Sequence, residues 1–258
     1  MITDQGFTCL VINLDGSEDR WSRISAQLNE AKVTYKRISA VDGRKFDLAS
    51  LDYYDANRAI RYMGRDLVGG EIGCYLSHVD AVRTFLDLGG KHCLVLEDDS
   101  IPDRELVRIV HGVTACLARL DPNWRIVNLG NPRLKISTPV HEIKTNRNSY
   151  TLCKAFYFPM TTGAILWSRK GAEDFLSEHG KLFAPIDNYL RHWITRAGGG
   201  YAFSPRPVET TEAESEIADA PRSRNRRSKL YGLRKQRRLL FDKWIALRHK
   251  LNSGAARG

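Results

Sequence analysis

Three consecutive carboxylates, Glu97, Asp98 and Asp99, follow the apolar residues of the segment CLVLEDDS (93–100). Adjacent negative charges repel one another, so such a cluster is either a solvated surface turn or a place where something positive binds. Carboxylate oxygens are the ligands that Mg²⁺ and Mn²⁺ prefer, and these ions often complete their shell with substrate phosphates. Because strand side chains alternate between faces, we expect Glu97 and Asp99 to point to one side and Asp98 to the other.

Further polar residues end or follow apolar segments. Asp15, Asp42 and Asn128 come at or after the apolar segments 7–14, 33–38 and 124–130. In an open α/β sheet, ligands bind beyond the carboxyl ends of the strands. We therefore expect these side chains to lie near the three acids at one edge of a sheet, which favours a binding site over a surface turn.

The elements that position these residues alternate between strands and helices. Asp15 and Glu18 form a predicted capping box for a helix that ends near Glu30, and Gly69-Gly70 opens another that ends at Gly89-Gly90. Residues 131–154 are polar and are expected to be irregular, whereas 155–168 are typical of two strands around a turn. This alternation predicts an α/β fold with a mixed, mostly parallel sheet.

Composition indicates one sizeable globular domain with an appendage, because the 258 residues are 42% hydrophobic and 27% charged. We place the domain at residues 1–220 and the appendage at 221–258. Neither a run of about 18 apolar residues nor a basic, apolar leader is present, so no membrane span or secretory signal is expected. The five cysteines lack CxxC spacing, which favours core residues in a reducing compartment over a zinc site.

The formal net charge of +10 is concentrated in the C-terminal segment. Residues 222–250 hold eight arginines and four lysines against the single acid Asp242, whereas residues 1–221 have a net charge of −2. A nearly neutral body argues against a nucleic-acid groove across it. Residues beyond Ser228 have a helical pattern with an apolar stripe, which fits an anionic membrane surface, docking on the body, or non-specific nucleic-acid binding. The stripe consists of Leu233, Leu240, Trp244, Leu247 and Leu251.

Two common nucleotide-binding motifs, GxxxxGK[ST] and GxGxxG, are absent from the sequence. Several short segments instead form a specific set when they are taken in chain order: VINLDGSEDRW (11–21), AVDG (40–43), GGEIGCYLSH (69–78), LVLEDD (94–99), TTGAILWSRKGAEDFL (161–176), PIDNYL (185–190) and, more weakly, SEI (215–217). This set resembles glycosyltransferase family 25, the bacterial lipopolysaccharide glycosyltransferases related to collagen galactosyltransferases.

The resemblance implies a GT-A-like (Rossmann-like) domain with a DxD-type motif, which binds a UDP-sugar through Mn²⁺ or Mg²⁺. Asp99 would ligate the metal, and Glu97 would contact the ribose or a metal-bound water. Asp187 would be the general base for the acceptor hydroxyl, with Glu71 as its rival, although either acid is also explained as a helix N-terminal charge. The further residues implied at the nucleotide side are Asn13, Asp15, Arg20, Asp42, His78, Asp98 and Gly163.

Simpler explanations stay open for some of these residues: Asp15 as an N-cap, His78 as a packing residue and Gly163 as a turn glycine. The implied function is transfer of a hexose such as galactose, with inversion, to a sugar hydroxyl of a lipopolysaccharide core or related surface glycan. The expected location is cytoplasmic, peripheral on the inner face of the cytoplasmic membrane. The alternatives are a metal-dependent nucleotidyl or phosphoryl transferase and a catalytically silent sugar-nucleotide-binding membrane adaptor.

Overall fold

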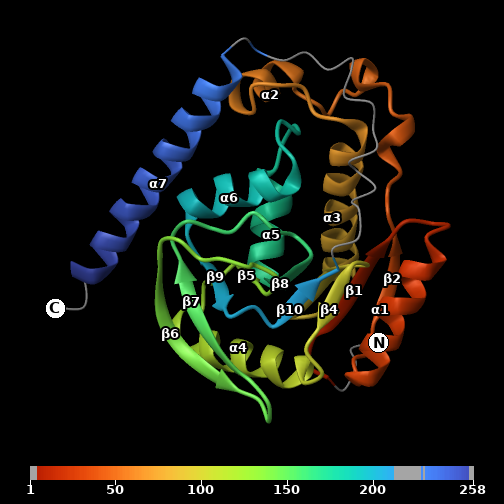
Figure 1. The fold of residues 1–258 in the computed structure, drawn as a ribbon, viewed down its shortest axis with the longest axis vertical. Helices are drawn as coiled ribbons and strands as arrows, with labels where there is room; N and C mark the ends of the chain where they lie inside the picture. Colours follow the sequence, from red (N-terminus) through yellow and green to blue (C-terminus); the bar gives the residue numbers. More distant parts are fainter. Residues whose placement is uncertain (1–4, 212–227, 229, 256–258) are drawn as a thin grey trace.

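The computed structural model describes residues 5–211, 228 and 230–255, and an eight-stranded sheet forms the centre of this described part (Figure 1). The strands are β1 (Thr8–Asn13), β2 (Lys36–Ser39), β3 (His92–Glu97), β5 (Ile126–Asn128), β6 (Ser137–Lys144), β7 (Ser149–Ala155), β8 (Ala164–Ser168) and β9 (Gly200–Ser204). Their order across the sheet is β2-β1-β3-β8-β5-β9-β7-β6. Their pairings make all of these strands run in one direction except β7 and β8. The predicted α/β class with a mixed, mostly parallel sheet is confirmed.

Helices cover both faces of the sheet. Helices α1 (Glu18–Glu30) and α4 (Leu106–Leu120) pack on one face, and α3 (Gly69–Asp87), α5 (Arg169–Glu178) and α6 (Ile186–Ala197) pack on the other. Along β1, Leu10 and Ile12 join the core beneath α3, whereas Cys9 and Val11 join the core beneath α1. A strand buried on both faces needs apolar residues at every position, which explains the unbroken apolar runs in the sequence.

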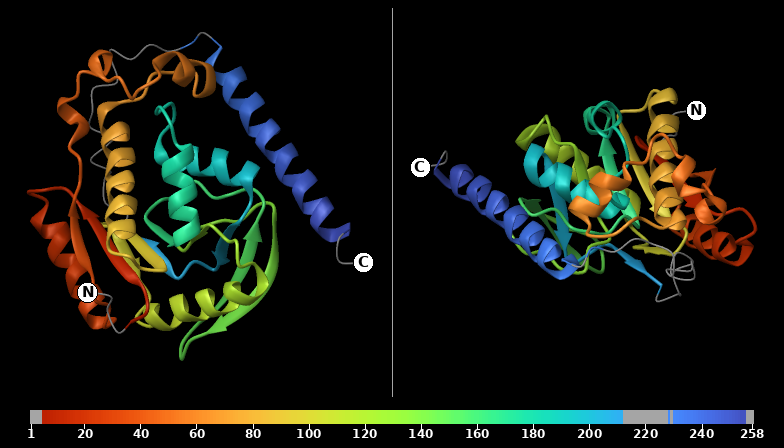
Figure 2. Two further views of the ribbon diagram at one scale, coloured as in Figure 1. Left: turned by 180° about the vertical axis from the view of Figure 1, so that it is seen from behind. Right: turned by 90° about the horizontal axis from the view of Figure 1, so that it is seen from above.

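The remaining elements lie at the edges of this framework. Helix α2 (Ala56–Tyr62) follows the short 3₁₀ turns η1 (Gly43–Lys45) and η2 (Leu48–Ser50), and the strands β4 (Ser100–Pro102) and β10 (Val208–Thr210) form a separate antiparallel pair. Helix α7 (Tyr231–Ala255) contacts α2 and α6. Figure 2 shows α7 along the flank of the molecule away from α1 and β2. Within the described ranges, no helix is long and apolar enough to cross a membrane.

The start of α1 differs from the prediction. Ser17, not Asp15, is the N-cap residue, and its side chain makes no capping hydrogen bond. Asp15 instead accepts a hydrogen bond from Ser39 Oγ at 3.0 Å and lies beside Arg37 at 3.6 Å. Gly16 has a φ of +90°, so the chain makes a turn between Asp15 and the helix. The predicted end of the helix at Glu30 is correct.

The prediction that residues 131–154 are irregular is wrong, because β6 and β7 form an antiparallel hairpin there. Strand β6 lies at the edge of the sheet and is mostly exposed, so its polar residues give no buried pattern to recognise. Of the two strands expected within 155–168, only β8 forms among the described residues. The domain boundary at residue 220 and the SEI segment (215–217) lie outside the described residues, so that boundary stays a prediction.

Candidate functional site

A close contact between η1 and the start of α3 builds one wall of the candidate site. A Cβ atom on Gly43 would lie 1.9 Å from the carbonyl oxygen of Gly69, and one on Gly73 would lie 2.4 Å from the carbonyl oxygen of Val41. Only glycine allows backbones to approach this closely. The Ser77 hydroxyl donates to the Gly73 carbonyl oxygen and accepts from the Val41 N–H, both at 2.8 Å, so it holds the two segments together.

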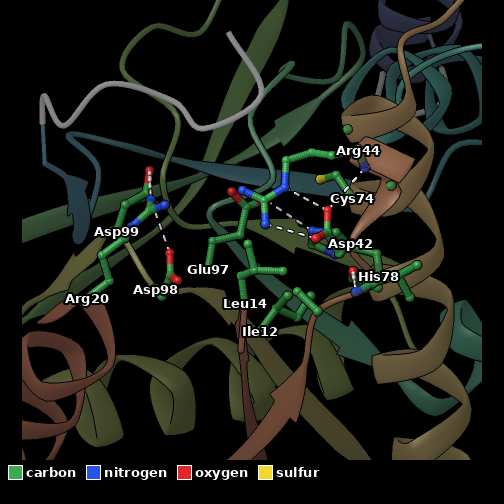
Figure 3. Close-up of a pocket in the computed structure, with 15 residues that line it drawn as sticks. Ile12, Leu14, Arg20, Asp42, Arg44, Cys74, His78, Glu97, Asp98 and Asp99 are labelled. Atoms are coloured by element: carbon green, nitrogen blue, oxygen red, sulfur yellow. Dashed lines mark hydrogen bonds and ion pairs between the residues drawn. The ribbon is translucent and has the colours of Figure 1, made fainter. Parts of the chain in front are cut away.

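Two adjoining cavities open beyond the carboxyl ends of β1 and β3. The first, of ≈ 150 Å³, is lined by apolar residues of β1 and by polar residues of η1, α3 and the acidic segment (Figure 3). The second, of ≈ 310 Å³, extends toward the start of α6 and the segment 160–163. Cys74, Glu97 and Asp99 line both cavities, so these side chains lie where the two meet.

The three acids have three different surroundings. Strand β3 ends at Glu97, so Asp98 and Asp99 lie in a turn and the strand alternation expected for them does not apply. The buried Asp98 accepts a hydrogen bond from Asn13 Nδ2 at 2.7 Å and pairs with Arg20 Nη2 at 3.1 Å. Arg20 also lies 3.9 Å from Asp99 Oδ2, between the two carboxylates in Figure 3. Asp98 therefore holds Arg20 at the edge of the acidic cluster, while the buried Asn13 supports Asp98 from outside both cavities.

Glu97 is held by the histidine predicted to share its site. His78, fully buried on α3, places Nε2 3.0 Å from Glu97 Oε1. Burial alone would raise the pKa of Glu97, but hydrogen bonds with His78 and Thr162 hold it below its ordinary value. Cys74 lies one helical turn before His78, and its ligand atom lies within 4.8 Å of those of His78 and Glu97. Burial, followed by the nearby Glu97, raises the pKa of the Cys74 thiol well above its ordinary value.

Asp99 is the acid best suited to a cation. Burial, followed by the charge of Glu97, raises its pKa to about 6, and Arg20 offsets only part of this effect. Its Oδ1 atom is buried and accepts no hydrogen bond from the residues that the structure describes. An orphaned carboxylate oxygen beside a second carboxylate fits a divalent cation, which would supply the missing positive charge.

The two predicted base candidates both line the second cavity but differ in their partners. Glu71 accepts two hydrogen bonds from the Arg65 guanidinium, at 2.8 and 2.5 Å, and one from the Val68 N–H at 3.0 Å. Asp187 accepts hydrogen bonds only from the backbone and side chain of its neighbour Asn188 among the described residues. Burial raises the pKa of Asp187 in spite of these bonds. Glu71 is tied to the helix start, whereas Asp187 is the more available proton acceptor, although it also lies in the first turn of α6.

Other predicted site residues are placed as follows. Asp42 lines the first cavity and binds Arg44 through two hydrogen bonds of 2.8 Å. Gly163 lines the second cavity, and its carbonyl oxygen accepts hydrogen bonds from Ser100 Oγ and the Glu97 N–H. Asp15 lines neither cavity. Three further residues that were not predicted from the sequence also line the cavities: Arg44, Cys74 and Thr162.

A usable signal existed for two of these unexpected residues. Arg44 directly follows the AVDG segment. Cys74 precedes His78 by four residues, which places Cys74 and His78 on one face of α3.

Asn128, expected near the acids, is fully buried and donates from Nδ2 to the carbonyl oxygen of Thr161 at 2.6 Å. It therefore supports the wall of the second cavity from behind.

The chain is similar in sequence to a family of known proteins. A family model described as "Glycosyltransferase family 25 (LPS biosynthesis protein)" matches residues 7–190. Procollagen galactosyltransferase 1 of Danio rerio is 28% identical over 185 residues, which cover 70% of this chain and 30% of that protein. A Rattus norvegicus protein named "Probable inactive glycosyltransferase 25 family member 3" is 31% identical over 185 residues, covering 70% of this chain and 32% of that protein. The chain thus spans about a third of the length of these curated relatives.

One solved structure with a similar fold shares little of its sequence with this chain. The crystal structure of a glycosyltransferase involved in glycosylation of the major capsid of PBCV-1 has a TM-score of 0.41 and 10% identity, covering 83% of this chain and 96% of that chain.

The fold and the site define an α/β protein with two cavities beyond the carboxyl ends of its central strands, both lined by acidic side chains. The match to the family model extends over most of the chain and includes both cavities' acidic residues. The chain belongs to glycosyltransferase family 25, and the resemblance inferred from its motifs is confirmed.

Proposed function

We propose that this protein transfers a hexose, galactose in the first instance, from a UDP-sugar to a sugar hydroxyl of a lipopolysaccharide core or related surface glycan. Family membership and the names of the galactosyltransferase relatives support the reaction class and the sugar. The observation that carries the proposal is that Asp99 and Asp187 line one cavity. One is a carboxylate suited to a cation, and the other is suited to accept a proton.

The first cavity is the proposed nucleotide site. Ile12, Leu14 and Val41 give it an apolar floor that suits a base and ribose, while Arg20 and Arg44 supply positive charge for the diphosphate. Arg44 is exposed and is held by Asp42, so its position is set before a ligand arrives. Pre-set cations of this kind lower the ordering cost of binding.

Asp99 would hold Mn²⁺ or Mg²⁺, assisted by Glu97 directly or through water. Such an ion commonly takes one or two protein carboxylates and completes its shell with phosphate oxygens. When bound, it would neutralise charge that develops on the departing diphosphate. Asp98 keeps the Arg20 guanidinium beside Asp99, so this positive charge would also stabilise the departing diphosphate.

Asp187 is the proposed base, and the second cavity is the proposed acceptor site. In an inverting transfer the base takes the proton of the attacking hydroxyl on the side opposite the leaving nucleotide. A raised pKa makes the Asp187 carboxylate a better proton acceptor, because proton transfer to it is more favourable. Glu71 is a weaker candidate because Arg65 and the Val68 N–H already occupy its oxygens.

The test begins with thermal unfolding of the purified protein with UDP-galactose, UDP-glucose or UDP-N-acetylglucosamine, each with and without Mn²⁺. A ligand that binds only the folded state raises the unfolding temperature. We expect stabilisation that needs both the metal and one nucleotide sugar, followed by release of UDP when a core oligosaccharide is added. Binding without turnover on a proven acceptor would instead favour the silent adaptor. Cleavage of the nucleotide between its phosphates would favour a phosphoryl or nucleotidyl transferase.

A further inference from the structure

Helix α7 is fixed to the body through one face. Asp242 is 1% exposed and pairs with Arg196 of α6 at 2.8 Å. One turn later, Ala246 is fully buried against Phe156 and Tyr157. The buried ion pair and the apolar contact lie four residues apart on the helix, so they set its rotation about its own axis.

The first half of α7 repeats this attachment. Arg234 donates from Nη1 to the carbonyl oxygen of Ile60 at 2.8 Å, and the Arg238 guanidinium lies 4.6 Å from the centre of the Tyr62 ring. These two arginines precede Asp242 by eight and four residues, on the same side of the helix. The attachment to α2 and α6 therefore does not involve the apolar stripe that the sequence analysis identified.

The stripe lies on the opposite side of α7. With a rotation of about 100° per residue, its members lie between about 140° and 200° from Asp242 around the helix axis. Their exposed fractions range from 49% to 72%. Seven of the ten large hydrophobic side chains that are exposed in the described part of the chain lie between residues 230 and 251. We call the stripe the outer face of α7: Leu233, Leu240, Trp244, Leu247 and Leu251.

Cations border the outer face on both sides. By the same rotation, Arg237 and Arg248 lie along one border, and Lys243 and Lys250 lie along the other. The Arg248 guanidinium lies 4.8 Å from the centre of the Trp244 ring. The one carboxylate within α7, Asp242, points toward the body and is neutralised there. The outer side of the helix thus combines exposed apolar groups with positive charge alone.

We propose that the outer face of α7 lies on an anionic lipid bilayer and holds the enzyme at the membrane surface. Leucine and tryptophan side chains enter the boundary between headgroups and acyl chains, and the bordering arginines and lysines bind lipid phosphates. Each such cation strengthens binding by about fivefold near an anionic surface. The helix axis lies in the plane of the membrane, because the stripe runs along the helix for about 27 Å.

A second copy of this chain fits the outer face less well. The spacing from Leu240 to Leu251 follows steps of four, three and four residues, which also suits a paired coiled coil. In such a pair, the positions beside the seam would hold Lys243, Arg248 and Lys250 of both copies, with no carboxylate to balance them. Like charges at these positions oppose pairing, whereas the same charges favour an anionic bilayer.

The test measures binding of the full chain to vesicles of phosphatidylglycerol and phosphatidylcholine, and to vesicles of phosphatidylcholine alone. The variant L240E/L247E changes two outer-face residues that are 64% and 49% exposed. Its control is L120E on α4, because Leu120 is 59% exposed, between the values for Leu240 and Leu247, but lies in no apolar stripe. We expect anionic vesicles to bind the wild type and L120E equally, and to bind L240E/L247E at least tenfold more weakly. Binding of the wild type should weaken as salt is raised.

Trp244 provides a direct reading of the contact. It is 50% exposed, whereas Trp124, Trp167 and Trp193 are buried, so a blue shift of its fluorescence on vesicles should disappear in W244F. Unchanged unfolding temperatures will show that the variants are folded. The proposal is wrong if wild type does not bind anionic vesicles or if L240E/L247E binds as well as L120E. It is also wrong if the leucines instead control dimer formation in solution, or if duplex DNA binds the wild type and L240E/L247E alike while vesicles bind neither.

Discussion

Replacing Asp99 by asparagine should make the metal-free protein more stable at neutral pH, although it should abolish metal-dependent function. The wild-type carboxylate has a buried oxygen without a hydrogen-bond partner in the described structure, and it faces the charge of Glu97. Asparagine has nearly the same shape and carries no charge. The backbone oxygen of Asp99 keeps its hydrogen bond from the Thr211 N–H, so the turn should be retained.

The magnitude follows from the raised pKa. Folding shifts the pKa of Asp99 from its ordinary value of 3.8 to about 6. Each pKa unit corresponds to about 1.4 kcal/mol, so an ionised Asp99 costs the folded state up to about 3 kcal/mol at neutral pH. Because the folded protein holds this proton more tightly than the unfolded chain, protonation of Asp99 stabilises the folded state. This stabilisation is fully present below pH ~4 and is lost as pH rises through ~6. The variant should therefore gain about 1–3 kcal/mol at pH 7.5 and nothing at pH 4.

Urea unfolding with a chelator, at several pH values between 4 and 7.5, measures this difference. The matched control is Asp98→Asn, whose carboxylate is satisfied by Asn13 and Arg20. Losing a buried, charge-assisted pair should destabilise that variant by about 1–3 kcal/mol. Mn²⁺ should then stabilise the wild type but not Asp99→Asn. A loss of stability in Asp99→Asn that does not depend on pH, or equal effects of the two substitutions, would refute the reasoning.

Three further substitutions test the site. Asp187→Asn should lower kcat by about 10²–10⁴-fold with unchanged donor affinity, and wild-type activity should fall as pH drops through the raised pKa of Asp187; normal turnover would exclude it as the base. Arg65→Met should destabilise the protein by about 1–3 kcal/mol in urea unfolding, because Glu71 loses both of its guanidinium hydrogen bonds; an unchanged midpoint would contradict this. Gly43→Ala should cost more than about 2 kcal/mol, since its Cβ would lie 1.9 Å from the Gly69 oxygen; a soluble variant of wild-type stability would show that η1 can move.

Much of the fold could be predicted from the sequence, because the central strands and α1, α3, α5 and α6 bury whole faces. The runs around β1 and β3 are apolar on both sides, and glycine marks both ends of α3. The hairpin β6–β7 could not be recognised because an exposed edge strand carries no burial pattern. The pairing of β4 with β10 joins residues about 100 positions apart, which local patterns do not report.

The site also has features that could be predicted from the sequence and others that could not. The motif positions indicated which residues gather at the strand ends, and the structure brings Asn13, Arg20, Asp42 and His78 together with the acids. The hydrogen-bond partners of the acidic residues could not be predicted, because these bonds join segments that fold against one another. The Arg65 guanidinium donates two hydrogen bonds to Glu71, and the Thr162 side chain forms a hydrogen bond with Glu97. Asp15, which follows β1, lies at the surface beside Arg37, and the turn at Gly16 carries the chain away from the site.

The three acids differ in their suitability for a cation because they have different hydrogen-bond and ion-pair partners, and their order in the motif does not decide it. Glu97 has a lowered pKa and is held by His78, whereas Asp98 pairs with Arg20 and accepts a hydrogen bond from Asn13. Of these three acids, only Asp99 combines a raised pKa with an oxygen that accepts no hydrogen bond from the described residues. A cation that binds here gains most from Asp99, so the stability lost by keeping that carboxylate ionised is recovered when the ligand is present. An acidic cluster that is unfavourable in the free protein is therefore the form expected of a site that binds the proposed metal and its charged substrate.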